Sequence, residues 1–282
     1  MKVFTNMSWF EECIHPEIRQ SIRVDELIFQ GQTDFQTVSI FDNNLLGRVL
    51  VLDDAVQITQ FDEHIYSESM VHIPMVSHPA PKRVLIVGAG DGTVLREVLK
   101  HDVLEQVTMI ELDGALVQLC REHLGEILNG AFDDPRLDLV IGDGAKFLCE
   151  SDQVFDVIII DSTDPDDNST ALFTDAFYTS AKARLASGGI VVAQAGCPAY
   201  QPSIRQHMRE RMQSHFTFGG FYHAAVPTYI GGLHAFSWAS DGHDLNAIAE
   251  KGVGHKASKL DVRYYAERSH KAAFYMEPAT SS

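Results

Sequence analysis

The chain has 282 residues, of which 45% are hydrophobic and 22% charged, and its 22 Lys and Arg against 39 Asp and Glu leave a net charge of −17. Such a charge repels nucleic acid and anionic lipid and attracts cationic small molecules. The sequence holds no apolar run of membrane-spanning length, no signal-peptide pattern, no CxxC pair among its four cysteines and no HExxH among its 13 histidines. We therefore expect a cytoplasmic protein with no metal, no disulfide framework, no nucleic acid partner and no membrane anchor.

Residues 1–72 predict a small N-terminal domain of antiparallel β-strands. Turns at Gly31, Asp42 and Asp53 separate short runs of apolar and β-branched residues, and a helix follows around Asp62–His72. The expected strands are Val24–Gln30, Phe35–Phe41, Gly47–Leu52 and Ala55–Thr59.

Residues 73–282 alternate between strand and helix patterns. The expected strands are Val84–Val87, Gln106–Ile110, Leu137–Ile141, Phe155–Ile160 and Ile190–Gln194, with Phe221–Val226 and Ala235–Ala239 as a closing antiparallel pair. The expected helices are Thr93–Lys100, Asp113–His123, Gly144–Cys149, Ala171–Leu185 and Ser203–Ser214, and the segment Leu260–Phe274 is expected to pack back on the core. This alternation predicts an α/β fold with a doubly wound, mostly parallel sheet.

The stretch Lys82–Asp113 predicts a strand, a glycine turn, a helix and a second strand. Gly88 and Gly90 let the backbone approach a ligand closely, and the helix beyond offers free N–H groups. Glu111, which closes the second strand, is placed to bind the two hydroxyls of an adenosine ribose. Asp91 lies inside the turn, where it would repel a pyrophosphate, so the group held there is a cation.

Acidic residues follow successive strands of the predicted sheet, and the carboxyl ends of these strands meet at one edge. Asp143 suits the exocyclic amine of adenine. With Glu111 assigned to the ribose, Asp91, Asp161 and Asp164 are left for the cationic parts of the ligands. A sulfonium donor with an adenosine body and an aminoalkyl arm, together with an amine acceptor, matches this set. A protonated amine cannot attack, so Asp161 is the candidate base. The acidic residues in question are Asp91, Glu111, Asp143, Asp161 and Asp164.

Several motifs resemble the polyamine aminopropyltransferase family, most closely the bacterial spermidine synthases. The resemblance covers nearly the whole chain. The motifs are AVQIT (Ala55–Thr59), DEHIYSE (Asp62–Glu68), VLIVGAGDGTVLREV (Val84–Val98), IELD (Ile110–Asp113), DDPR (Asp133–Arg136), GDG (Gly142–Gly144), FDVIIIDSTDP (Phe155–Pro165), ALFT (Ala171–Thr174), AQ (Ala193–Gln194) and PTY (Pro227–Tyr229).

The resemblance implies a methyltransferase-like Rossmann domain behind the small β-domain, and a homodimer. It implies decarboxylated S-adenosylmethionine as the aminopropyl donor, putrescine as the acceptor and 5′-methylthioadenosine as the by-product, with no tightly bound cofactor and no metal. Asp91 would hold the ammonium of the aminopropyl arm and Asp161 would accept the proton. The thioadenosine would contact Gln36, Glu111, Asp143 and Gly144, and the amine channel would be lined by Tyr66, Asp164, Gln194 and Tyr229.

Three positions depart from the family pattern. Ser67 stands where the family carries a His or Gln that contacts the polyamine, so we list it among the substrate-binding positions with altered acceptor fit. The usual Asp-Pro-x-Gly-Pro loop reads Asp164 to Asn168, with two extra carboxylates. The arginine of the TxRDEF motif is replaced by Phe61.

Four other functions remain open from the sequence. The first is an aminopropyltransferase with a different acceptor amine, which the altered loop favours. The second is an S-adenosylmethionine-dependent N-methyltransferase, against which Asp91 argues because the methionine carboxylate would meet a like charge. The third is a catalytically silent nucleoside- or polyamine-binding protein, which the retained Asp161 opposes. A nicotinamide dehydrogenase fits least, given Asp91.

Overall fold

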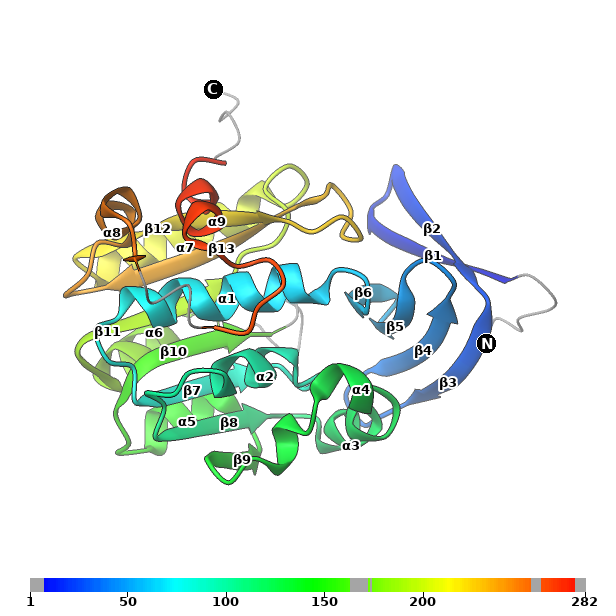
Figure 1. Ribbon diagram of the computed structural model, residues 1–282, viewed down its shortest axis with the longest axis horizontal. Coiled ribbons are helices and arrows are strands. Elements are labelled where there is room, and N and C mark those ends of the chain that lie inside the picture. Colours follow the sequence, from blue (N-terminus) through cyan, green and yellow to red (C-terminus); the bar gives the residue numbers. More distant parts are fainter. Residues whose placement is uncertain (1–7, 163–171, 173, 255–259, 277–282) are drawn as a thin grey trace.

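The computed structural model describes residues 8–162, 172, 174–254 and 260–276, except for the side chains of residues 14 and 15. An N-terminal β-unit lies beside a larger α/β unit (Figure 1). Within the described residues, none of the helices combines the length and the apolar character needed to cross a bilayer.

The N-terminal unit consists of a hairpin packed on a four-stranded antiparallel sheet (Figure 1). Apolar side chains of both form one small core, with Phe10 and Ile22 of the hairpin against Phe41 and Val49 of the sheet. The hairpin strands are β1 (Ser8–His15) and β2 (Ile18–Val24), and the sheet runs β3 (Glu26–Gln32), β4 (Thr37–Asn43), β5 (Gly47–Leu52) and β6 (Ala55–Thr59).

The larger unit is built on a seven-stranded sheet in the order β12-β13-β11-β10-β7-β8-β9. Strands β11 to β9 in this order are parallel, and β13 and β12 add an antiparallel edge. The strands are β7 (Arg83–Gly88), β8 (Gln106–Glu111), β9 (Leu137–Ile141), β10 (Phe155–Asp161), β11 (Leu185–Gln194), β12 (Phe218–Ala225) and β13 (Leu233–Ser240). The chain runs outward from β7 to β9 and then returns to place β10 on the other side of β7. Ligands of open α/β sheets bind at the carboxyl ends of strands at such a reversal.

Helices cover both faces of this sheet, because successive buried strand residues point to opposite faces. Ile86 and Ile159 pack with Met70 and Leu95 on one face, and on the other Leu85 packs with α5, α6 and α7. The helices are α1 (Glu63–Ser77), α2 (Thr93–Leu99), α3 (Gly114–His123), α4 (Gly125–Leu128), α5 (Gly144–Glu150), α6 (Asp175–Ala183), α7 (Pro202–His215), α8 (Leu245–Lys251) and α9 (Glu267–Ala273), with a 3₁₀ turn at Ala131–Asp133. Helix α1 links the two units and packs against α2 and the large sheet.

The predicted α/β fold is confirmed, including the antiparallel pair at the edge of the sheet. The hairpin of β1 and β2 is a structure that the sequence reading missed. The predicted helix Ala171–Leu185 is wrong at its end, because α6 stops at Ala183 and Leu185 already belongs to β11. Helix α6 begins after Thr174, whose side chain accepts a hydrogen bond from the Phe177 N–H and so caps the helix.

The C-terminal segment packs back on the core, as predicted for Leu260–Phe274. The buried Glu68 of α1 accepts hydrogen bonds of 2.8, 2.8 and 2.6 Å from the backbone N–H groups of Arg263, Tyr264 and Tyr265. A carboxylate that receives three backbone donors in the interior has its hydrogen-bonding capacity satisfied, so this contact ties the end of the chain to α1.

Candidate active site

A cavity of about 400 Å³ lies where the carboxyl ends of the parallel strands face the N-terminal sheet. Its lining comes from both units, with Phe35, Leu52 and Gln57 on one side and the glycine turn on the other. Of the predicted site residues, eleven line the cavity: Gln36, Tyr66, Gly88, Gly90, Asp91, Glu111, Asp143, Gly144, Asp161, Gln194 and Tyr229. Asp164 and the altered loop after it lie outside the described residues.

The glycine turn and the end of β10 are in direct contact. Gly88 has a φ of +85°, and a Cβ added there would overlap the backbone carbonyl oxygen of Asp161. The same oxygen accepts a 2.8 Å hydrogen bond from the Ala89 N–H. Only glycine combines this conformation with such a close approach, so Gly88 determines how near the turn lies to Asp161.

Glu111 closes β8 and is held against the turn. A Cβ at Gly90 would lie 2.9 Å from Glu111 Oε2, and Glu111 Oε1 accepts a 2.9 Å hydrogen bond from the Asp113 N–H. Burial raises the pKa of Glu111 to about 7, although the backbone hydrogen bond opposes the shift. A carboxylate with one oxygen held by backbone and the other beside the turn can accept hydrogen bonds from a ligand there.

Asp91 is half-buried in the turn and is oriented by the residue that starts α2. Asp91 Oδ1 accepts 2.7 Å hydrogen bonds from both the N–H and the Oγ1 of Thr93. Burial raises the pKa of Asp91, while the Thr93 bonds and the more distant Arg96 favour the charged form. The second carboxylate oxygen has no hydrogen bond to the described residues, so it can bind a cation.

At the opposite side of the turn, two further carboxylates cap helices. Asp143 Oδ1 accepts from the N–H groups of Ala145 and Lys146 at 2.8 and 3.1 Å, which starts α5. Asp113 caps α3 and also accepts a 2.9 Å bond from Gln36 Nε2, which reaches across from the loop before β4. Gln36 thus joins the N-terminal sheet to the large unit at the cavity wall.

Asp161 ends β10 and is bound by a tyrosine of α1. Tyr66 Oη donates a 2.6 Å hydrogen bond to Asp161 Oδ1. Burial raises the pKa of Asp161 to about 7 and the charge of Asp91 adds to the shift, while the Tyr66 bond opposes it. A carboxylate that titrates near neutrality is suited to accept a proton from a reacting group.

Two more predicted residues stand on either side of this pair. Tyr229 contacts the Tyr66 ring at a centroid distance of 5.7 Å and donates a 2.6 Å hydrogen bond to the carbonyl of Gln57. The buried Gln194 ends β11, where its amide donates to the Ser162 carbonyl at 3.2 Å and accepts from the Gly196 N–H at 2.9 Å. These contacts hold the two strand ends together beside Asp161.

Two family models match the chain: the spermine/spermidine synthase domain at residues 63–249 and the spermidine synthase tetramerisation domain at residues 8–60. A polyamine aminopropyltransferase of Escherichia coli O1:K1 is 42% identical over 279 residues, which cover 97% of each chain. The chain belongs to the spermine/spermidine synthase family. The predicted family and the predicted enzyme class, an aminopropyltransferase, are thereby confirmed.

Solved structures of the family have the same fold. A spermidine synthase in complex with the transition-state analogue AdoDATO matches with a TM-score of 0.90 and 36% identity over 96% of this chain and 92% of the other. The spermidine synthase of Thermotoga maritima matches with a TM-score of 0.85 and 34% identity over 95% and 90% of the two chains.

The aminopropyltransferase departs from the sequence prediction at Ser67, which does not line the cavity. Its side chain is buried and its hydroxyl donates to the Glu63 carbonyl at 2.9 Å and lies 3.2 Å from Glu63 Oε2. Consecutive helical residues point about 100° apart, so with Tyr66 toward the cavity, Ser67 faces α2 instead. A direct contact of Ser67 with the amine is therefore not supported by this geometry.

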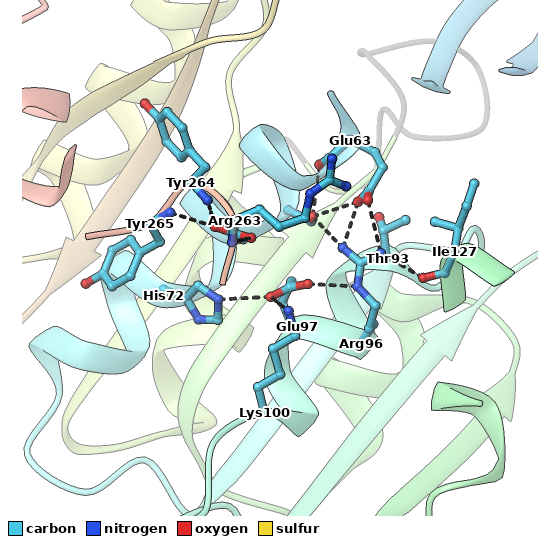
Figure 2. A network of polar contacts seen from close by, with 12 residues as sticks. Glu63, His72, Thr93, Arg96, Glu97, Lys100, Ile127, Arg263, Tyr264 and Tyr265 are labelled. Carbon is cyan, nitrogen blue, oxygen red and sulfur yellow. Dashed lines mark hydrogen bonds and ion pairs between the residues drawn. The ribbon is translucent and has the colours of Figure 1, made fainter. Parts of the chain in front are cut away.

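The helix that carries Tyr66 is fixed by a buried polar network (Figure 2). Arg96 of α2 pairs with Glu63 of α1 at 2.7 Å and with Glu97 at 2.7 Å, and His72 Nε2 lies 3.0 Å from Glu97. Burial disfavours the Glu97 carboxylate, but its contacts with His72 and Arg96 outweigh this and lower its pKa to about 2. Tyr66 lies between Glu63 and His72 on α1, so the network holds it in position toward Asp161.

Two buried titratable residues of the cavity wall, Glu12 and His234, are not indicated as site residues by the sequence analysis. Glu12 of β1 is buried, accepts a 3.0 Å hydrogen bond from the Val56 N–H, and has its pKa raised to about 7 by burial. His234 of β13 is buried among aromatic rings. The period of two in a strand places Glu12 on the face of the buried Phe10, and His234 on that of the buried Phe236. This alternation is the signal that could have identified both.

Proposed function

We propose that this aminopropyltransferase moves the aminopropyl group of decarboxylated S-adenosylmethionine to putrescine, releasing spermidine and 5′-methylthioadenosine. The observation that carries the proposal is the charge of the cavity. Its described lining contains no Lys and no Arg, and its carboxylates are those of Glu12, Asp53, Asp91, Glu111, Asp113, Asp143 and Asp161. Crowded carboxylates without cationic partners favour positively charged ligands, and both proposed substrates are cations.

The donor occupies the side of the glycine turn. We assign the ribose hydroxyls to Glu111 and the ammonium of the aminopropyl arm to Asp91, whose second oxygen is open to a ligand. An intact methionine carboxylate would meet the charge of Asp91, which supports the decarboxylated donor. The thioadenosine is assigned to Gln36, Gly88, Gly90, Glu111, Asp143 and Gly144.

The acceptor occupies the side of Tyr66, Gln194 and Tyr229. Glu12 and Asp161 both act on Tyr229, whose pKa is raised well above its usual value by burial and then by these and other nearby carboxylates. A diamine with an ammonium at each end matches two carboxylates that flank one tyrosine. We therefore assign the reacting amine to Asp161 and the other end to Glu12.

The reaction is a displacement at the carbon beside the sulfonium. An alkyl ammonium with an ordinary pKa of about 10.4 has no lone pair until it loses a proton, and Asp161 accepts that proton. The free amine nitrogen forms a bond to the carbon while the carbon–sulfur bond breaks, and the electron pair leaves with sulfur. Sulfur becomes neutral in 5′-methylthioadenosine, so a site built for cations favours release of this product.

Assay of the purified protein with the decarboxylated donor and a panel of amines tests the proposal. We expect release of 5′-methylthioadenosine, fastest with putrescine, and calorimetry should show tighter binding of the decarboxylated donor than of S-adenosylmethionine. Asp91→Asn should raise the donor KM by about tenfold or more, because an ammonium loses a charged partner, and should narrow the preference between the two donors.

Three outcomes would contradict parts of this proposal. No release of 5′-methylthioadenosine with any amine would leave a silent binding protein. Tighter binding of S-adenosylmethionine with methylated amine as product would favour an N-methyltransferase. Faster turnover with another amine would show that this amine, and not putrescine, is the preferred acceptor, and the assignment of the reaction as an aminopropyl transfer would stand.

Self-association belongs to the same proposal. The match of residues 8–60 to a tetramerisation domain supports an oligomer whose subunits meet through the N-terminal β-unit. A homodimer and a cytoplasmic location stay predictions.

A further inference from the structure

One histidine of the cavity wall has no role in the function proposed above. His234 lines the cavity and is 9% exposed. Its ring is edge-on to Tyr66 at a centroid distance of 5.1 Å, to Tyr229 at 5.4 Å and to Phe236 at 5.2 Å. It therefore stands beside both tyrosines of the acceptor side, one of which is bonded to Asp161.

The surroundings of His234 favour an apolar side chain. Its buried Nε2 has no hydrogen-bond partner among the described residues. A buried polar atom without a partner destabilises a fold, and a side chain such as methionine would pack among these three rings without that cost. Because His234 lines the cavity, its unsatisfied nitrogen is available to a bound ligand that can satisfy it.

The imidazole is also in its neutral form. Burial lowers the pKa of His234 to about 3, and the nearby His223 adds to the shift. A neutral imidazole carries one lone pair that can accept a hydrogen bond. Both neighbouring tyrosine hydroxyls already donate elsewhere, Tyr66 to Asp161 and Tyr229 to the Gln57 carbonyl, so the donor for this lone pair comes from the bound molecule.

We propose that His234 is an amine-binding residue, whose neutral imidazole accepts a hydrogen bond from an N–H of the acceptor. This inference rests on the proposed aminopropyl transfer and adds a residue to its acceptor side. The imidazole contributes an acceptor without a second negative charge, so it raises the pKa of the ammonium that Asp161 must deprotonate less than another carboxylate would. The acceptor side then has two kinds of residue. The carboxylates favour positively charged amines, and His234 orients the amine through one of its N–H groups.

Two variants of His234 and one control test the proposal. His234→Met keeps the size and removes the hydrogen-bonding nitrogens, and His234→Gln keeps a polar group near Nε2. His223→Met is the matched control, because His223 is a buried histidine of the neighbouring strand β12 that does not line the cavity. The readouts are KM for the amine, KM for the donor, kcat, the melting temperature, and calorimetric binding of the amine to the complex with 5′-methylthioadenosine.

We expect His234→Met to raise KM and Kd for the amine about tenfold, with the donor KM and the melting temperature not worsened. His234→Gln should recover part of the affinity, and His223→Met should leave amine binding unchanged. Unchanged amine KM and Kd in His234→Met would overturn the inference, as would an equal loss in His223→Met. These results differ from failure of the proposed function, in which the unmodified enzyme itself neither turns over nor binds any amine.

Discussion

The two halves of the cavity are built in different ways. In the donor half, each carboxylate is oriented by backbone two or three residues along the chain, as Asp91 is by Thr93 and Glu111 by Asp113. In the acceptor half, the partners are distant in sequence: Tyr66 and Asp161 are 95 residues apart, and Tyr229 and Gln57 are 172 apart. The donor half is therefore a property of short segments, whereas the acceptor half exists only after α1, β6, β10 and the loop that leads into β13 have packed.

This difference has a functional consequence. Local hydrogen bonds hold the donor carboxylates in place independently of the acceptor half. Substitutions in the acceptor half should therefore leave donor binding unchanged. The acceptor half consists of rings in mutual contact around one base, so a change at any ring should alter the base or the fit of the amine. Variants that affect one half and spare the other test this division.

The largest effect is expected from Asp161→Asn. Asn keeps the size of the side chain and can accept the Tyr66 hydrogen bond, but it cannot take the proton of the amine. We expect kcat to fall by about 10²–10⁴-fold, the usual contribution of a general base, with little change in the donor KM. Steady-state kinetics with saturating amine measure this loss, and circular dichroism controls for the fold. Turnover within a factor of a few of the unmodified enzyme would show that Asp161 is not the base.

A smaller effect, with a defined pH dependence, is expected from Tyr66→Phe. Asp161 has a pKa of about 7 in the free enzyme and acts as a base only when ionised, so kcat/KM should rise with pH up to about this value. The Tyr66 hydrogen bond favours the ionised form, and its loss should move the rising limb to higher pH. Rates measured from pH 5.5 to 9 should therefore show a deficit of several-fold to about tenfold near pH 7 that shrinks at pH 9.

The same experiment can contradict the assignment. A deficit that is constant across the pH range would mean that Tyr66 contributes only packing or direct contact with the amine. Phe is the matched replacement because it preserves the ring contacts with Tyr229 and His234.

The contrast between the halves also explains what could be predicted from the sequence. The Lys82–Asp113 stretch contains a strand, a turn and the residues that orient its own carboxylates, so reading it locally was sufficient to find Asp91 and Glu111. The position of Asp161 at a strand end followed from the order of the elements. That Tyr66 bonds to it depends on the packing of α1 on the large sheet, and motif spacing alone does not determine this.

The sequence is least informative where a polar side chain occupies a buried position. Glu12 places a carboxylate on the face of β1 that carries the buried Phe10, and this weakens the apolar alternation that would predict the strand. His234 shares one face of β13 with the buried Phe236 and Trp238. This period of two indicates that the histidine is buried, but its contacts with the two tyrosines depend on the packing of distant segments. Ser67 was indicated by the resemblance to the family motif, and the structure directs its side chain to α2.

The smallest effect is expected at Gln36. This residue lines the cavity from the loop before β4 and donates a hydrogen bond to Asp113 of the donor half. Gln36 Nε2 and Thr33 Oγ1 both donate to Asp113 Oδ2, at 2.9 and 2.6 Å, but only Gln36 lines the cavity. Gln36→Ala should raise the donor KM a few-fold and lower the free energy of unfolding by about 1 kcal/mol, the usual value of one hydrogen bond. Thr33→Val removes the parallel donor to Asp113 and also the acceptor of the Phe35 and Gln36 N–H groups. It should lower stability by a similar or larger amount and leave the donor KM nearly unchanged, because the Gln36 side chain stays in the cavity wall. If both variants raised the donor KM equally, Gln36 would act through Asp113 alone, and the N-terminal sheet would support the donor half without contacting the nucleoside.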